Sequence, residues 1–339
     1  MLVPQDGTRS PNPSLSIVVT SFTLDRLDDV TNLLRSIRDQ ACPGLETVFV
    51  AEQSPDLARR VRERAARLSL PVRVLVNDGE AGVGVCRNMG IVASAAEVVA
   101  LVDDDTILFP GWAQEMIQSY SLDPDVVGIT GPAIPLWEDD AMSWFPREFY
   151  WMWGGTVWDW DQVREIRNVG GMNCSFKREV LLQAGLYLPH LGPKGGDERS
   201  SWFGSTGEEV ELSLRIRSRF PGAKIIYSPG AKVYHKVYRS RFNWRFMAKR
   251  AFSFGYAKRY LETLFRDDFR NQPVLHLERD HLRHILLKML PSLAREAFRS
   301  PLSAWRKATV ALIGTFFAGL GYLTCFVRPG TERRGSRRR

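Results

Sequence analysis

The chain has 339 residues, of which 44% are hydrophobic and 25% are charged, as in an ordinary globular protein. This composition excludes a disordered or fibrous chain, and the length allows one large α/β domain with an extension, or two domains. The four cysteines are widely spaced without a CxxC pair, which predicts neither a zinc site nor a disulfide framework and favours a reducing compartment. The polar, proline-rich start predicts no signal peptide, and we expect residues 1–13 to be disordered.

Charge is distributed unevenly along the chain, whose formal net charge is +8. Residues 231–339 carry 24 Lys and Arg against 7 Asp and Glu, whereas the first 230 residues carry 22 against 31. This asymmetry predicts an acidic body with a basic extension that faces an anionic partner. Charge alone leaves two kinds of partner open, a nucleic acid or a lipid surface.

Apolar runs and amphipathic segments alternate through the first 105 residues. We expect strands at 15–22, 47–54, 72–78 and 97–105, with helices at 27–40, 57–68 and, after a glycine-rich turn, within 79–95. The alternation predicts a Rossmann-like, mostly parallel sheet flanked by helices, in which ligands bind beyond the carboxyl ends of the strands. Polar residues fall at those ends: Ser21, Glu52, Asn77 and Asp103–Asp105.

Beyond residue 130 the alternation loosens. An aromatic cluster extends from Trp137 to Trp160 and has three interpretations. It could form a core beneath a long loop, a stacking platform for a sugar, or a belt at a membrane interface. Further along we expect a strand leading into a helix at 169–185, a helix at 205–219 and two strands within 223–237.

Three consecutive aspartates, Asp103–Asp105, follow directly on the fourth apolar run. Mutual repulsion and desolvation make such a cluster costly unless a cation lies beside it. Carboxylate oxygens at the ligand edge of a sheet hold Mg²⁺ or Mn²⁺ together with phosphate oxygens. The triplet therefore predicts a metal–diphosphate site, and the alternative is a solvated loop.

Together these motifs resemble glycosyltransferase family 2 with the GT-A fold, over residues 14–240. The resemblance rests on SFTLDR after the first strand, RNMG at 87–90, the three aspartates and GEEVEL at 207–212. EFYW, RNVGGMNCSFKREV, LGPKGG, HKV and RAFSFGYAKR further resemble the glucosyl-dolichyl-phosphate glucuronosyltransferases of archaeal N-glycan assembly and their bacterial relatives. The resemblance implies an inverting enzyme that moves a sugar, glucuronate being one candidate, from a UDP-sugar to a hydroxyl of a polyprenyl- or dolichyl-linked saccharide.

The resemblance also implies roles for individual residues. Asp105, Asp103 and His235 would hold Mn²⁺ or Mg²⁺, and Glu209, with Glu208 beside it, would act as general base. The nucleotide sugar would be bound by Thr20, Phe22, Glu52, Arg87, Asn88, Asp103, Asp104, Gly170, Gly171 and Asn173. The family usually has an aspartate near Glu52, which leaves the nucleotide preference open. Without the resemblance, other roles are open. The two glutamates could simply interact favourably with the positive end of a helix dipole. His235 could be a packing residue, and Asn173 could satisfy a turn.

The extension combines basic, aromatic and apolar segments. Residues 233–261 interleave Lys and Arg with aromatic side chains, which is typical of nucleic-acid binders and of helices in a lipid headgroup layer. Residues 308–327 contain no charged side chain and are long enough to span a bilayer. We therefore expect 241–339 to be a basic, helical, membrane-associating region, with no nucleic-acid partner.

The topology of this region stays open at the level of sequence. A nucleotide-sugar enzyme belongs on the cytoplasmic side of the cell membrane, and the basic end of the chain prefers the same side. An apolar hairpin broken near Gly319 and Gly321 would satisfy both, and the alternative is a buried helix of a soluble protein. Candidates for contact with a lipid phosphate are Arg239, Arg241, Lys249 and Arg250.

Two other functions fit some of the same features. A nucleotidyltransferase also needs metal-binding carboxylates, but it offers no evident role for Glu209. A nucleic-acid-binding or scaffold protein could carry a nucleotide-binding α/β body and a basic extension.

Overall fold

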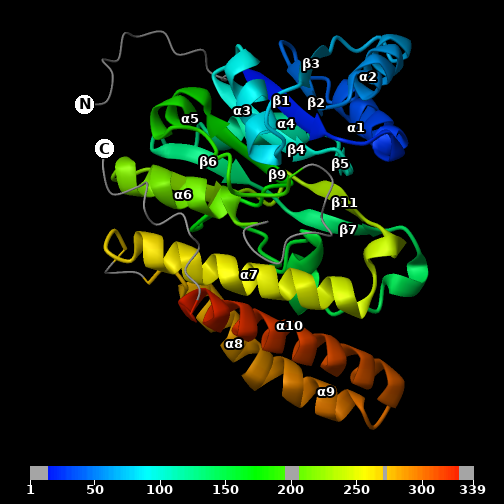
Figure 1. Cartoon of the computed structure of the whole chain (residues 1–339), viewed down its shortest axis with the longest axis vertical. Coiled ribbons are helices and arrows are strands. Elements are labelled where there is room, and N and C mark those ends of the chain that lie inside the picture. The colour runs from blue at the N-terminus through cyan, green and yellow to red at the C-terminus, as the bar shows by residue number, and fades with distance from the viewer. Residues whose placement is uncertain (1–13, 195–205, 270–272, 328–339) are drawn as a thin grey trace.

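The structure is a computed structural model that describes residues 14–194, 206–269 and 273–327. The predicted disorder of residues 1–13 and the basic end of the chain lie outside these ranges. Figure 1 shows a body built on a sheet with helices on both sides, and below it a layer formed by the helices of the extension.

An eight-stranded sheet forms the centre of the body, with the strand order β3-β2-β1-β4-β9-β6-β10-β8. Its strands are β1 (Leu15–Ser21), β2 (Glu46–Glu52), β3 (Arg73–Asn77), β4 (Val98–Asp103), β6 (Val126–Thr130), β8 (Arg164–Glu165), β9 (Asn173–Lys177) and β10 (Lys224–Tyr227). Strands β1–β4 are parallel to their neighbours among themselves, and β10 is parallel to β6. Strand β9 runs antiparallel to β4 and β6, and β8 runs antiparallel to β10. The prediction of a mostly parallel sheet is confirmed.

Six helices cover the two faces of this sheet: α1 (Leu27–Arg38), α2 (Pro55–Arg67), α3 (Val83–Ala93), α4 (Trp112–Ser119), α5 (Arg178–Ala184) and α6 (Glu208–Arg219). Alternate residues of each strand point to opposite faces, so Ile17 and Val18 enter different cores. One core joins the sheet to α1, α2 and α4, and the other joins it to α3, α5 and α6. Packing on both faces of the sheet therefore fixes the positions of the strand ends.

A small second sheet lies beside the carboxyl end of β4. It consists of β5 (Thr106–Leu108), β11 (Val233–Val237) and β7 (Ala133–Trp137), in the order β5-β11-β7. Because β5 begins directly after Asp105, and His235 pairs with Thr106, this sheet carries His235 to the acidic turn.

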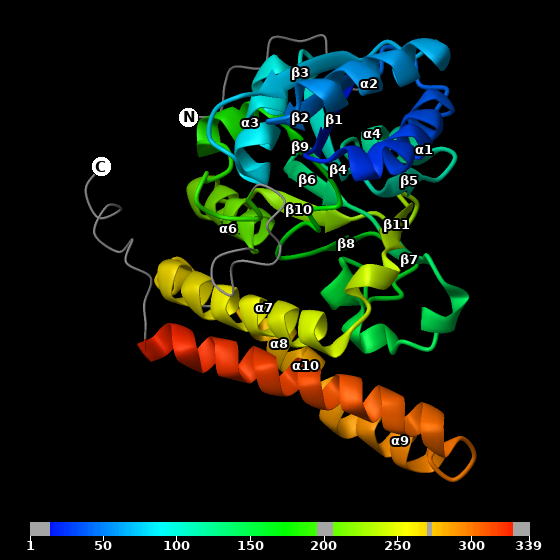
Figure 2. The same ribbon diagram turned by 45° about the vertical axis from the view of Figure 1, so that its right-hand side comes forward.

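The extension consists of α7 (Trp244–Phe265), α8 (His276–His284), a π-helical stretch (Ile285–Met289), α9 (Leu290–Glu296) and α10 (Pro301–Val327). In Figures 1 and 2, α7 lies between the body and α10. Short 3-10 helices lie at Leu24–Arg26, Asp140–Met142, Arg147–Trp153 and Arg239–Arg241. The predicted membrane-associating region thus begins just before α7, and its apolar segment lies within α10.

Helix α10 is unbroken, so the structure does not form the hairpin broken near Gly319 and Gly321, one of the topologies left open by the sequence. Gly321 of α10 and Gly255 of α7 instead allow close packing between the two helices. A Cβ atom on Gly321 would overlap the carbonyl oxygen of Phe252, and one on Gly255 would overlap that of Ala318. These glycines allow the backbones of α7 and α10 to touch.

The aromatic cluster is mainly a core between the body and the extension. Phe145, Phe149 and Trp153 are buried together with Val310 of α10, and the rings of Trp153 and Phe246 stack with their centres 5.5 Å apart. Packing of this kind holds the extension against the body. Trp151 and Trp158 additionally line the cavity described next.

Candidate active site

Asp103, Asp105 and His235 bring potential metal-ligand atoms within 4.8 Å of one another. The imidazole Nε2 of His235 lies 3.2 Å from Oδ1 of Asp105 and 3.9 Å from Oδ2 of Asp103. Two carboxylates and an imidazole are ligands that suit Mn²⁺, and the carboxylates alone suit Mg²⁺.

The state of Asp105 fits a bound cation. Its Oδ1 is buried and accepts no hydrogen bond of good geometry from the described residues. Burial by itself raises the pKa of Asp105, but the charges of His235, Arg26 and Arg241 more than offset this, and the net effect lowers the pKa. These charges favour the ionised carboxylate, and Asp105 offers an oxygen to the cluster of potential metal ligands.

Asp104 points to a different set of partners. It accepts hydrogen bonds from Ser21 Oγ and, at 2.5 Å, from Arg26 Nη1, which also lies 3.4 Å from Asp105 Oδ2. Burial raises the pKa of Asp104 to about 6, against the opposing effect of Arg26. Sequence interpretation missed Arg26, although it stands in the SFTLDR motif as the first cation after β1.

Arg87 connects the acidic turn to the start of α6. The residue is buried on α3, and its guanidinium lies 3.0 Å from Asp103 Oδ1 and 3.3 Å from Glu208 Oε1. It also donates a hydrogen bond of 3.2 Å to the carbonyl oxygen of Gly171. One cation thus orders both carboxylates and the glycine loop.

Glu209 lies opposite this arrangement, in the first turn of α6. A Cβ atom on Gly171 would lie only 3.6 Å from the carboxyl carbon of Glu209, so the side chain faces the glycine loop. Burial, followed by the charge of Glu208, raises the pKa of Glu209 to about 8. A carboxyl group with a pKa near neutrality is suited to proton transfer.

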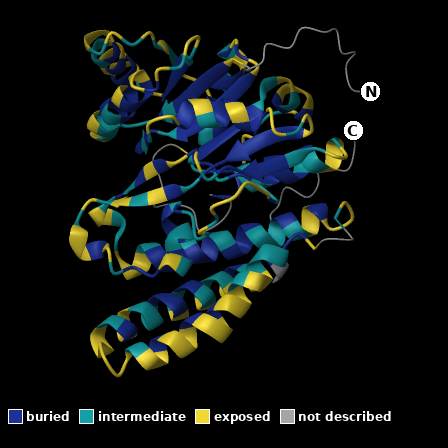
Figure 3. Ribbon diagram, turned by 180° about the vertical axis from the view of Figure 1, so that it is seen from behind, coloured by how far each residue is buried: buried dark blue, intermediate teal, exposed yellow. Residues whose placement is uncertain are grey.

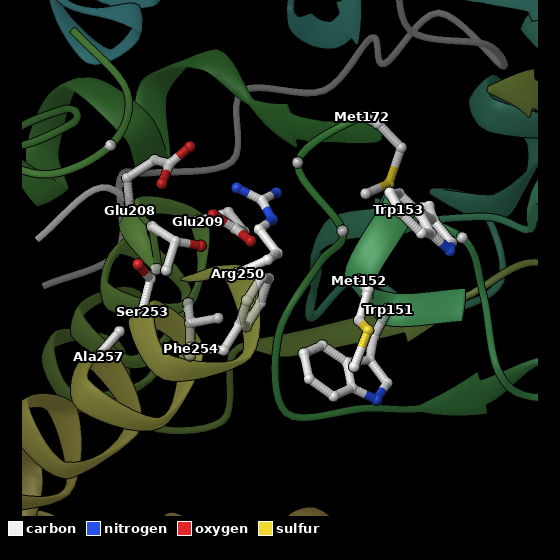
Figure 4. A pocket seen from close by; sticks show the side chains of 18 of the residues that line it. Trp151, Met152, Trp153, Met172, Glu208, Glu209, Arg250, Ser253, Phe254 and Ala257 are labelled. Carbon is white, nitrogen blue, oxygen red and sulfur yellow. The ribbon is translucent and has the colours of Figure 1, made fainter. Parts of the chain in front are cut away.

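A single cavity of about 930 Å³ contains these groups. In Figure 4, Glu208 and Glu209 lie on one side with Arg250, Ser253 and Phe254 of α7, and Trp151, Met152 and Trp153 lie on the other. The predicted site residues that line the cavity are Thr20, Phe22, Glu52, Arg87, Asp103, Asp104, Asp105, Gly170, Gly171, Glu208, Glu209, His235, Arg241, Lys249 and Arg250.

Three predicted site residues lie elsewhere. Asn173 is fully buried, where it accepts a hydrogen bond from Trp112 Nε1 and donates one to Ala231 O, so it braces the sheet. Asn88 exchanges hydrogen bonds with the backbone of Tyr187. Arg239 is exposed and paired with Asp139 at 3.3 Å. The described partners of these three side chains lie within the protein, and their contact with substrate stays a prediction.

A second charged group, not predicted from the sequence, lies at the far end of the cavity. Arg167 makes two hydrogen bonds of 2.7 and 2.9 Å to Glu278 of α8, and Lys258 Nζ lies 3.8 Å from the same carboxylate. His281 is on the same helix and lines the cavity too. Arg167 and Lys258 both stand within motifs that carry the family resemblance, which was the available signal.

The fold and the site define a GT-A glycosyltransferase. Residues 16–181, just under half of the chain, match the model of glycosyl transferase family 2, so this part of the chain is a domain of that family. This match favours a glycosyltransferase over the nucleotidyltransferase and nucleic-acid-binding alternatives.

Known relatives agree with this assignment. The chain is 28% identical over 321 residues to a glucosyl-dolichyl phosphate glucuronosyltransferase of Haloferax volcanii, covering 93% of this chain and 97% of the relative. It is 30% identical over 172 residues to an uncharacterized glycosyltransferase of Haemophilus influenzae, covering 50% of this chain and 55% of that protein.

Two solved structures show the same fold. The mannosyltransferase PcManGT from Pyrobaculum calidifontis, in complex with GDP-Man and Mn²⁺, has a TM-score of 0.61 at 17% identity, covering 95% of this chain and 91% of its own. GalNAc-T7 with UDP, GalNAc and Mn²⁺ has a TM-score of 0.51 at 16% identity, covering 80% of this chain and 54% of its own.

Proposed function

We propose that the protein is an inverting, metal-dependent glycosyltransferase that moves a sugar from a UDP-sugar to a hydroxyl of a polyprenyl- or dolichyl-linked saccharide. The observation that carries this proposal is that one cavity joins the acidic turn to Glu209 and to the basic wall of α7. The similarity to the Haloferax volcanii enzyme makes UDP-glucuronate the first donor to test.

The donor would lie at the acidic turn. Asp103, Asp105 and His235 would hold Mn²⁺ or Mg²⁺, which supplies positive charge beside the donor diphosphate. Arg87 would add a fixed positive charge and keep Asp103 in place. Gly170 and Gly171 leave the wall of the cavity open to the sugar.

The acceptor would meet Glu209. Its carboxylate takes the proton of the acceptor hydroxyl as that oxygen bonds to the anomeric carbon and the bond to the diphosphate breaks. Glu208 is held by Arg87, so the two neighbouring glutamates have different tasks. A single displacement from the face opposite the leaving group inverts the anomeric centre.

The extension would bring the enzyme to its lipid substrate. Arg241, Lys249 and Arg250 line the cavity, where they suit the phosphate of a lipid-linked acceptor. Within the described residues, α10 is the one helix long and apolar enough to cross a membrane. We infer association with the cell membrane, with the catalytic domain on the cytoplasmic side.

The test uses the purified protein with UDP-glucuronate, Mn²⁺ and a glucosylated prenyl phosphate. We expect release of UDP and a lipid product heavier by one glucuronate in mass spectrometry, with loss of both in Asp105→Asn and Glu209→Gln variants. An Asp56→Asn variant, changed at an exposed position of α2, is the control and should keep full activity. Full turnover by the Asp105→Asn protein would contradict the proposal.

A further inference from the structure

Helices α8–α10 expose a continuous face of large apolar side chains. The exposed fractions are 74% for Leu287, 91% for Phe298, 71% for Trp305, 68% for Leu312 and 63% for Leu323. Figure 3 shows exposed positions along the outer side of these helices, whereas the sheet is buried. A large exposed apolar face marks a surface that a membrane or another protein covers.

The packing of α10 argues against a crossing of the bilayer. Its backbone touches that of α7 at Gly255 and Gly321, and α7 carries Arg245, Lys249 and Lys258 among its charged residues. If α10 stood across the membrane, α7 would be carried into the hydrocarbon beside it. Burying each of these cations in hydrocarbon would be strongly unfavourable. A helix parallel to the membrane surface avoids this cost.

The ionic side chains around the apolar face suit anionic lipid headgroups. Exposed cations of α8–α10 and their connections are Arg279, Arg283, Lys288, Arg295, Arg299 and Arg306. Asp280 is the one exposed acidic residue between 276 and 325. Helices with an apolar face and a basic border lie flat in the headgroup layer of a bilayer.

The cavity of the active site reaches this same face. Its lining includes Leu282 and Ile285 near α8 and Gly314, Thr315 and Gly319 of α10. Leu282 is 44% exposed, and a Cβ atom on Gly319 would meet nothing within 4 Å. Because Leu282 and Gly319 are both exposed and both line the cavity, the cavity reaches the surface between α8 and α10.

We propose that α8–α10 lie flat in the headgroup layer of an anionic bilayer, and that the opening between α8 and α10 admits the prenyl chain of the acceptor. The identity of the acceptor rests on the function proposed above, whereas the orientation of the helices does not. The saccharide then reaches Glu209 from the aqueous side while its lipid chain stays in the membrane.

Orientation is tested with nitroxide labels on Leu302→Cys, Leu312→Cys and Leu323→Cys, each in a Cys42→Ser background. The protein is bound to vesicles of phosphatidylethanolamine and phosphatidylglycerol. We expect all three labels at a similar, shallow depth. A label at 312 much deeper than those at 302 and 323 would show a crossing, and labels without lipid contact would show a soluble extension; either overturns the proposal.

Binding is tested by flotation with the same vesicles. A Leu312→Glu/Phe316→Glu variant should lose at least about 10-fold in the bound fraction, because charges on the apolar face oppose burial in lipid. Leu122→Glu is the matched control, since Leu122 is 61% exposed on the body, and it should bind like the unchanged protein. Equal flotation of all three proteins would exclude this face as the docking surface.

The opening is tested with Gly319→Leu, because a Cβ atom at this position would meet nothing within 4 Å. We expect a rise of at least about 10-fold in KM for a long-chain prenyl acceptor and no change for a short-chain acceptor with the same saccharide. Equal effects on both acceptors would overturn the proposed opening. If the unchanged protein transferred sugar to neither acceptor, the proposed function would be contradicted. The depths of the nitroxide labels would still decide the orientation of the helices.

Discussion

Arg87 is the residue on which the charge balance of the site depends. It is buried between Asp103 and Glu208, and these contacts offset the repulsion between the acidic turn and the start of α6. Glu209 lies beside Glu208 in surroundings that disfavour a second negative charge, and its pKa is raised to about 8. One glutamate is therefore paired with an arginine, while its neighbour is the one suited to exchange a proton.

This difference predicts the pH dependence of transfer. A general base must be deprotonated, so kcat/KM should rise with pH and level off above about 8. In Glu208→Gln the neighbouring negative charge is absent, the pKa of Glu209 falls, and the rise should move to lower pH by about one pH unit. Initial rates between pH 5.5 and pH 9.5, at saturating metal, measure this range in roughly half-unit steps.

A Glu63→Gln variant serves as control, because Glu63 is a partly exposed residue of α2 that pairs with the exposed Arg59 and Arg60. Its profile should coincide with that of the unchanged enzyme. A profile that is flat through pH 8, or one that Glu208→Gln leaves in place, would show that Glu209 is not the base.

Arg26 predicts a second effect at the scale of a residue, this time on stability. Its side chain pairs with the buried Asp104, and removing one partner of a buried pair leaves an uncompensated charge. Arg26→Met should lower the free energy of unfolding by about 3 to 5 kcal/mol in urea titrations at pH 7. Arg26→Met/Asp104→Asn should recover part of this loss, since the carboxylate of Asp104 is gone while that of Asp105, 3.4 Å from Arg26, remains.

Arg38→Met is the comparison for a surface pair. Arg38 pairs with Asp39 while both side chains are well exposed, so its removal should leave the free energy of unfolding almost unchanged. If the double variant at 26 and 104 is as unstable as Arg26→Met, the ion pair is not the source of the loss.

At the scale of elements, the contact between α7 and α10 depends on glycine. Gly255→Ala would place a methyl group against the carbonyl oxygen of Ala318, and the helices would have to separate. We expect a loss of about 1 to 3 kcal/mol in the free energy of unfolding. Gly319→Ala, where the added methyl group meets open space, should be neutral or stabilising by up to about 1 kcal/mol through helix propensity. Similar unfolding midpoints for the two variants would refute close packing at Gly255.

The elements near the start of the chain could be predicted because their signals are local. The observed β1–β4 and α1–α3 lie within the predicted segments or extend past them by a few residues at one end. The short strands β5, β6 and β7 were not predicted, because such segments depend on pairing with remote partners. The reversed direction of β9 is set in the same way, by contacts with β4 and β6.

The site was predictable to the extent that family motifs carried it. His235 reaches Asp105 only because β11 pairs with β5, a contact that no local pattern indicates. Arg26 and Arg167 were missed because Lys and Arg are abundant here, and their partners Asp104 and Glu278 are remote in the sequence. The bracing contacts of Asn173 were not predictable, because its hydrogen bonds to Trp112 and Ala231 appear only in the folded sheet.

At the scale of the whole molecule, Glu278 links the extension to the glycine loop. Arg167 stands three residues before Gly170 and is bound by Glu278 of α8, so the position of the extension and that of the donor loop are connected. Lys258 of α7 adds to the same cluster, and these cations lower the pKa of Glu278 to about 2 although burial alone would raise it.

Glu278→Gln should therefore destabilise the protein in a pH-dependent way. A carboxylate whose pKa is lower in the folded state contributes stability above its ordinary pKa of 4.5, and this contribution disappears as pH falls through about 2. We expect the variant to lose about 3 kcal/mol in the free energy of unfolding at pH 7, with the difference narrowing steadily as pH falls from 5 toward 3. Urea titrations of both proteins at several pH values measure this, with Glu63→Gln as the surface control. A difference that stays constant from pH 7 to pH 3 would mean that Glu278 acts through packing rather than through its charge, and the link between extension and donor loop would then have to be sought in the aromatic core around Phe149 and Trp153.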